Sequence, residues 1–132
     1  MIDLSLLREN PDAIRASQRA RGADESLVEK AAQLDIERRS LLSQFEALRA
    51  EQNAHGKLVA AAPKEEKAAL VAQGQELAGR VKAADARAEE VLVELNKILL
   101  TIENVVIEGV PAGGEENFVV IKEVGNKPEF SF

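Results

Sequence analysis

The chain lacks cysteine, tryptophan and tyrosine, and its single histidine is His55. Without cysteine it can form neither a disulfide nor a thiolate metal site, which suits a reducing cytosol. One histidine without cysteine also rules out a Cys–His pair and a histidine-based metal cluster. Disulfide scaffolds, enzymes with a cysteine nucleophile and zinc sites built from cysteine or several histidines are therefore excluded.

Long hydrophobic runs and large aromatic side chains are also missing. No apolar run approaches the roughly 20 residues that a membrane-spanning helix needs, and the N-terminus lacks the basic and apolar blocks of a signal peptide. We therefore expect a cytoplasmic chain without a membrane partner. Of the four phenylalanines only Phe45 lies in the central region, so any core there is a thin seam of aliphatic residues.

The net charge of −6 is unevenly distributed along the chain. Residues 103–132 hold six Glu against two Lys, whereas residues 27–63 hold five basic and five acidic residues. The excess acidity lies mainly at the C-terminal end, so the central region can present a basic face locally. Net charge therefore does not exclude RNA as a partner.

Two heptad repeats of apolar residues, separated by a break at residues 60–63, dominate the centre of the chain. The first consists of Leu27, Leu34, Leu41 and Leu48, with Ala31 and Phe45 interleaved. The second consists of Leu70, Leu77, Ala84, Val91 and Ile98, with Val81, Ala88, Leu95 and Ile102 interleaved. A 3.5-residue spacing places a narrow apolar stripe on one face of a helix, and two such helices can cover each other. We predict an all-α fold, a long antiparallel two-helix coiled-coil hairpin.

Turn and cap signals divide the chain further. Asn10-Pro11 and Gly22 predict two short helices within residues 3–22, followed by long helices over about 24–60 and 63–102. Together, residues 1–102 would form a helical arm. Residues 103–132 would form a linker and a partly extended tail, with 119–121 and 130–132 as short strands whose packing partner lies outside this sequence.

Three residues of the predicted seam are unusual. Arg38 occupies an apolar position at the level of residues 85–90, and we expect it to pair with an acid there and fix the register. Gly74 either makes room for Phe45 or another bulky residue opposite, or softens the helix locally. His55 continues the leucine repeat and is expected to be a seam or tip residue rather than an acid or base.

The sequence offers no catalytic constellation. Gly113-Gly114 lacks the Lys-Ser/Thr of a phosphate-binding loop, and the Glu pairs resemble solvated helix faces. We predict no catalytic, cofactor-binding or metal-binding residue in this chain. The interspersed basic residues fit either a solvated coiled-coil surface or contacts to an RNA backbone, which leaves a scaffold or adaptor that binds proteins as the alternative function.

Several motifs resemble the N-terminal region of bacterial seryl-tRNA synthetases, and the resemblance spans the whole chain. In chain order they are MIDLSLLRENPD (1–12), LDIERR (34–39), LRAEQN (48–53), IEN (102–104), VPAG (110–113), EN (116–117) and GNKPEFSF (125–132).

The resemblance implies the tRNA-binding arm of a class II aminoacyl-tRNA synthetase, a ligase of protein biosynthesis. It also implies that the tail at 103–132 leads toward a catalytic domain outside this sequence. The parent enzyme would be a homodimer that attaches serine to its tRNA with ATP and Mg²⁺, and DNA would not be a partner. The arm would recognise the long variable arm of tRNA(Ser) by its shape and backbone. Candidate tRNA-binding residues are Arg39, Arg49, Lys57, Lys64, Arg80 and Arg87.

Overall fold

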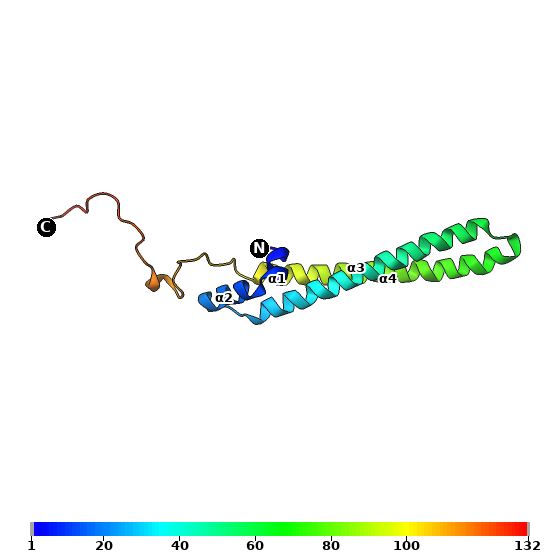
Figure 1. Ribbon diagram of the computed structural model, residues 1–132, viewed down its shortest axis with the longest axis horizontal. Coiled ribbons are helices and arrows are strands. Elements are labelled where there is room, and N and C mark those ends of the chain that lie inside the picture. The colour runs from blue at the N-terminus through cyan, green and yellow to red at the C-terminus, as the bar shows by residue number, and fades with distance from the viewer. Residues whose placement is uncertain (1, 132) are drawn as a thin grey trace.

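The computed structural model describes residues 2–131 and consists of a long helical hairpin with two short helices at its base (Figure 1). Its elements are α1 (Leu4–Glu9), α2 (Pro11–Arg21), α3 (Ser26–Ala61), α4 (Lys64–Thr101) and the short 3₁₀ helix η1 (Glu115–Asn117). The long helices have 36 and 38 residues, so each extends about 55 Å at a rise of about 1.5 Å per residue. The two-helix hairpin predicted from the heptad repeats is confirmed.

Side-chain caps explain where the short helices begin and end. Asp3 accepts a hydrogen bond from the Ser5 amide at 2.8 Å, and Asn10 accepts one from the Ala13 amide at 3.2 Å. Each cap satisfies an amide that has no partner within its helix. Gly22 ends α2 with a φ of 69°, a left-handed conformation that glycine adopts without steric cost.

The register of the hairpin follows from two ion pairs between α3 and α4. Lys30 Nζ lies 3.3 Å from a Glu94 carboxylate oxygen, and an Arg87 guanidinium nitrogen lies 2.9 Å from a Glu37 oxygen. The partners advance by seven residues on α3 and retreat by seven on α4, as an antiparallel coiled coil requires. The same apolar seam therefore faces inward along both helices.

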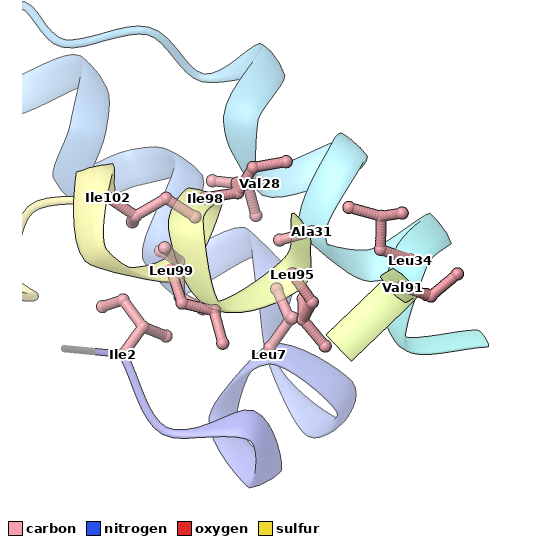
Figure 2. Close-up of a cluster of buried hydrophobic side chains, with 11 residues drawn as sticks. Ile2, Leu7, Val28, Ala31, Leu34, Val91, Leu95, Ile98, Leu99 and Ile102 are labelled. Atoms are coloured by element: carbon pink, nitrogen blue, oxygen red, sulfur yellow. The ribbon is translucent and has the colours of Figure 1, made fainter. Parts of the chain in front are cut away.

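The hydrophobic core lies at the base of the hairpin, where α1 and α2 pack against the seam. Figure 2 shows side chains from the N-terminal segment, α3 and α4 converging there. The buried cluster comprises Ile2, Leu7, Ile14, Val28, Ala31, Leu34, Val91, Leu95, Ile98, Leu99 and Ile102. Burying one Val, Leu or Ile side chain contributes about 1.5–3 kcal/mol, so this cluster stabilises the arm mainly from its base.

A buried carboxylate fixes α1 to α3 beside this core. The Asp35 side chain is only 2% exposed, and Arg8 donates to both of its oxygens, at 2.8 and 2.6 Å. Arg39 donates a third bond at 3.1 Å. The hydrogen bonds from Arg8 hold the pKa of Asp35 below its ordinary value, although burial opposes this effect.

The inner face of α2 holds the segment that follows α4. Gln18 Nε2 donates to the Glu103 carbonyl at 3.0 Å, and the Val106 amide donates to Ser17 Oγ at 2.8 Å. Both side chains are buried. Because these bonds engage the backbone of residues 103–106, α2 sets the direction in which the chain leaves the hairpin.

The remaining tail departs from the base, away from the turn of the hairpin (Figure 1). Its residues from 107 to 131 are exposed and extended apart from turns and η1. The predicted strands at 119–121 and 130–132 are wrong for the described residues, and Phe132 lies outside them. A strand needs a neighbouring strand to pair its backbone groups, and none is present within residues 2–131.

Candidate nucleic-acid interface

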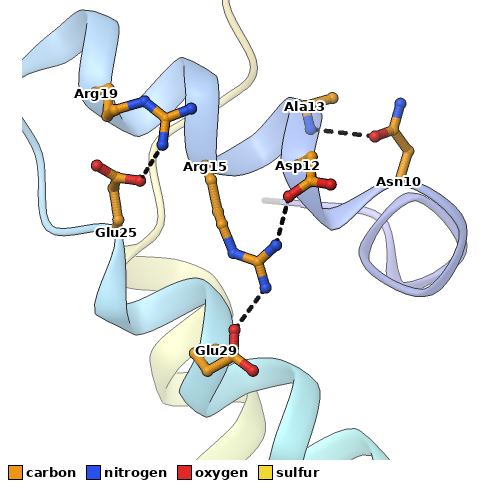
Figure 3. Close-up of polar contacts among 7 residues, drawn as sticks. All are labelled: Asn10, Asp12, Ala13, Arg15, Arg19, Glu25 and Glu29. Carbon is orange, nitrogen blue, oxygen red and sulfur yellow. Dashed lines mark hydrogen bonds and ion pairs between the residues drawn. The ribbon is translucent and has the colours of Figure 1, made fainter.

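Most cations at the base of the arm are neutralised by carboxylates. Figure 3 shows Arg15 between Asp12 and Glu29, and Arg19 beside Glu25. The carboxylates hold the pKa of Arg15 above its ordinary value, with the Glu29 hydrogen bond as the largest cause. These arginines stabilise the packing of α2 on α3, and their charge is offset locally.

The distal segment, which we define as residues 49–82, has the opposite character. It contains six basic and four acidic residues, whereas the rest of the hairpin, 26–48 and 83–101, contains five basic and eight acidic residues. No ion pair within the described chain involves a residue of the distal segment. Its exposed cations are Arg49, Lys57, Lys64, Lys67, Arg80 and Lys82.

The six residues proposed from the sequence therefore fall into two groups. Arg39 is bonded to Asp35, and Arg87 contacts both Glu37 and Glu90, at 2.9 and 3.2 Å. The other four, Arg49, Lys57, Lys64 and Arg80, belong to the distal segment. Of the six, only these four offer a guanidinium or ammonium group without a carboxylate partner in the described chain.

Arg80 shows how the coiled-coil register leaves a cation unpaired. Stepping seven residues from Glu37 and Arg87 toward the turn leads to Gln44 on α3 and Arg80 on α4. The position that supplies an acid to Arg87 thus supplies an uncharged amide at the level of Arg80. The hydrogen-bonding capacity of Arg80 remains available to an external anion.

Arg49 is held in a different way. Its guanidinium carbon lies 5.8 Å from the centroid of the Phe45 ring, a cation–π geometry. Such stacking restrains the side chain but leaves its N–H donors available. Arg49 therefore differs from Arg39 and Arg87, each of which already donates to at least one carboxylate.

The expected ion pair of Arg38 is not present. Arg38 is half-buried, and no acid within residues 2–131 forms an ion pair with it. The predicted alignment of this part of α3 with residues 85–90 was correct, because the neighbouring Glu37 forms an ion pair with Arg87. This ion pair lies beside the seam and not within it. There both groups stay hydrated, since the Arg87 and Glu37 side chains are 55% and 44% exposed.

Gly74 admits a side chain from α3, as one of its two interpretations required, but that side chain is His55 and not Phe45. A Cβ atom at Gly74 would lie 3.2 Å from His55 Cδ2. His55 Nε2 is 2.7 Å from the Leu70 carbonyl oxygen of α4. His55 is therefore a seam residue, as its place in the leucine repeat indicated.

Sequence reasoning passed over Lys67 and Lys82, which are exposed and unpaired like the four residues above. No acid stands three or four residues from Lys67 on its helix, whereas Asp85 stands three residues from Lys82, so helix spacing alone would have identified only Lys67. No group of three or more His, Cys, Asp or Glu side chains within residues 2–131 is arranged to hold a metal ion. No helix of the described chain is long and apolar enough to cross a membrane.

What the arrangement offers chemically is a stiff rod whose far end carries hydrated cations. Lysine and arginine side chains bind phosphate through charge-assisted hydrogen bonds. The helical parts of the distal segment, 49–61 and 64–82, extend about 20 and 28 Å at a rise of about 1.5 Å per residue, which is long enough to follow several phosphates of an RNA helix. The distal segment is therefore suited to the backbone of a double-stranded RNA.

Comparison with known proteins identifies relatives of one kind. The chain is 55% identical over 132 residues to the serine–tRNA ligase of Leifsonia xyli, and 49% identical to that of Thermobifida fusca. In each case all of this chain is matched but only 31% of the relative. The chain thus spans about a third of the length of these ligases.

Solved structures of the same kind share the fold. The cytoplasmic serine–tRNA ligase of Naegleria fowleri, in complex with AMP, superposes with a TM-score of 0.77 at 28% identity, over 96% of this chain and 28% of that one. The seryl-tRNA synthetase of Pyrococcus horikoshii, complexed with ATP, gives 0.76 at 28% identity, over 89% and 27%. Residues 1–106 match the family described as the seryl-tRNA synthetase N-terminal domain, and the chain belongs to that family.

Proposed function

We propose that the distal segment binds the long variable arm of tRNA(Ser) through its phosphate backbone. In this role the chain selects the tRNA to which a parent seryl-tRNA synthetase attaches serine. The observation that carries the proposal is the separation of charge along the hairpin. Cations near the base are mostly paired with acids, whereas the distal segment carries six exposed cations without ion pairs in the described chain.

Shape supports the same function. The deep, narrow major groove of an A-form helix hides its bases, so proteins recognise such helices mainly through backbone position and groove geometry. A helical hairpin fits this task because the helix geometry sets the spacing of the cations along each of its two helices. A projecting variable arm is a feature that such a rod can detect without contacting an anticodon.

The chemistry of aminoacylation belongs to the rest of the parent enzyme in this proposal. The relatives are named serine–tRNA ligases, and two solved relatives were captured with AMP or ATP. This chain spans only 31% of such a relative, and ATP and Mg²⁺ would bind in the remaining part of the parent enzyme. The parent would be a cytoplasmic homodimer in which the arm delivers tRNA to an active site.

Filter binding with two RNAs tests the proposal. One RNA is tRNA(Ser), and the other is the same tRNA without its variable arm. We expect the chain to prefer the complete tRNA, most clearly at about 50 mM salt, where phosphate contacts contribute most. Equal affinity for both RNAs, or no binding to either, would contradict the proposal and favour a protein-binding scaffold.

A further inference from the structure

The seam between α3 and α4 becomes less tightly packed toward the turn. The most distal buried hydrophobic residue is Leu34 on α3 and Leu77 on α4. Beyond them, seam positions such as Gln52, Val59 and Gly74 are only half-buried. Apolar burial therefore fixes the base of the hairpin much more firmly than its distal end.

One hydrogen bond joins the two helices in this weakly packed region. His55 Nε2 lies 2.7 Å from the Leu70 carbonyl oxygen, a backbone group of α4. The carbonyl is an acceptor only, so the Nε2 atom is the donor and carries a proton. Between the Glu37–Arg87 pair and the turn, this bond is the only hydrogen bond or ion pair that connects α3 to α4 within residues 2–131.

The imidazole of His55 lies against a glycine of α4, one turn beyond Leu70. A Cβ atom at Gly74 would approach His55 Cδ2 to 3.2 Å and Nε2 to 3.4 Å. An alanine there would press on the ring at a separation tighter than ordinary van der Waals contact. Gly74 thus provides the notch into which the imidazole fits, and the two residues act as a matched pair.

We propose that His55, seated against Gly74, is the positioning residue that holds the distal segment in its RNA-binding arrangement. This inference rests on the proposed function. The bond connects residues 15 apart in sequence. Lys57, Lys64 and Lys67 lie in the loop that it closes, and all three are exposed. Fixing the ends of this loop fixes the spacing of cations on both sides of the turn.

We call the hydrogen bond from His55 to the Leu70 carbonyl, with the imidazole seated against Gly74, the pin. The pin affects RNA binding without contacting RNA. When it is broken, the two helix ends separate or slide, and a smaller fraction of molecules presents the cations at matching positions. The apparent dissociation constant rises by the inverse of that fraction. Because no phosphate contact is removed from the competent state, the dependence of affinity on salt stays the same.

Binding of tRNA(Ser) to His55→Ala and Gly74→Ala tests the inference, with Gly79→Ala as the control. A Cβ atom at Gly79 meets nothing within 4 Å, so the control has the same chemical change on the same helix without a clash. We expect each test variant to bind about threefold to tenfold more weakly, the equivalent of one ordinary hydrogen bond. The double variant should bind no worse than either single one, since both remove the same pin.

The salt dependence of binding separates positioning from direct contact. We expect the slope of log affinity against log salt to be unchanged in His55→Ala and to fall by about one in Lys57→Ala, which removes a phosphate contact. A reduced slope in His55→Ala would overturn the inference, because it would make His55 a contact residue. A general loss of helix content, measured by circular dichroism, would overturn it too, because the pin would then support the whole fold.

The remaining outcomes distinguish this inference from the function on which it rests. If Lys57→Ala and Lys64→Ala weaken binding while His55→Ala and Gly74→Ala do not, the pin is irrelevant and the proposed function stands. If neither pair of variants weakens binding, the distal segment does not bind the tRNA, and both proposals fail.

Discussion

Asp35→Asn removes the negative charge that holds α1 against α3. The carboxylate accepts two hydrogen bonds from Arg8 and one from Arg39, and its side chain is 2% exposed. Asparagine has the same size but offers one acceptor oxygen and an NH₂ group that faces two guanidinium donors. We expect the variant to fold with a weakened contact between α1 and α3.

The exposure of the partners sets the size of the effect. Removing one partner of a fully buried ion pair costs about 3–5 kcal/mol because a charge remains buried and unpaired. Here the Arg8 and Arg39 side chains are 43% and 54% exposed, so both cations regain water in the variant. We therefore expect a loss of about 2 kcal/mol in the free energy of unfolding, close to one charged hydrogen bond. Such a loss is a large share of a typical domain's stability of about 5–15 kcal/mol.

Urea unfolding at a series of pH values provides the assay. The pKa of Asp35 is lowered in the folded chain, with the hydrogen bond from Arg8 as the largest cause. The ionised carboxylate therefore contributes its full stability above its unfolded pKa, and this stability is lost as pH falls through the folded pKa. The free energies of unfolding of the unmutated chain and of Asp35→Asn should therefore differ at pH 7 and become equal at acid pH.

A suitable control is Asp12→Asn. The Asp12 carboxylate is 85% exposed although it also contacts an arginine, so its loss should change the free energy of unfolding by less than about 1 kcal/mol. Two results would refute the reasoning about the buried carboxylate. One is an equal free energy of unfolding for Asp35→Asn and the unmutated chain at pH 7, and the other is a difference in that free energy that persists unchanged at acid pH.

Three further predictions concern other parts of the arm. Gly79→Ala should raise the free energy of unfolding by about 0.5–1 kcal/mol, because the site is helical and open; a lower midpoint in urea would contradict this. Ser17→Ala should accelerate hydrogen exchange of the Val106 amide by about tenfold, since Ser17 Oγ is the acceptor of that amide at 2.8 Å; an unchanged NMR exchange rate would show that the bond does not protect it. Arg80→Ala should weaken tRNA(Ser) binding and reduce the slope of log affinity against log salt by about one. Arg87→Ala should leave this slope unchanged, because the Arg87 guanidinium is already bonded to two carboxylates. Equal slopes for the two variants would refute the distinction between paired and unpaired cations.

The hairpin was predictable because the apolar heptad stripes run along the whole central sequence and each stripe must be buried against another helix. Leucines such as Leu27 and Leu34 recur at the coiled-coil period, and the break at residues 60–63 limits how the two stripes can meet. The helix ends at Asn10 and Gly22 were predictable for a similar reason, since caps depend on neighbours in sequence.

Features that depend on docking between distant segments were not predictable in this way. Asp35 reads as an ordinary surface acid of α3 until α1 brings Arg8 against it. Ser17 and Gln18 read as polar residues of a short helix, but both are buried because the chain after α4 crosses them. Strand propensity at 119–121 misled because a strand requires a pairing partner as well as suitable residues.

The sequence could supply candidate cations for the site, but it could not show which of them are already paired with a carboxylate. Four of the six proposed residues are unpaired in the described chain and two are not, and nothing in the identity of Arg39 or Arg87 separates them from Arg49 or Arg80. The difference arises from which residue stands opposite in the coiled coil. That information becomes available only when the register of α3 against α4 is known.

The central claim is that RNA meets the distal segment of the hairpin and not its base. An NMR titration of the chain with an RNA hairpin copied from the variable arm of tRNA(Ser) tests this claim most directly. We predict amide shift changes concentrated in residues 49–82, with the amides of α1 and α2 unaffected. Shift changes concentrated at the base, around Arg15 and Arg39, would contradict the account.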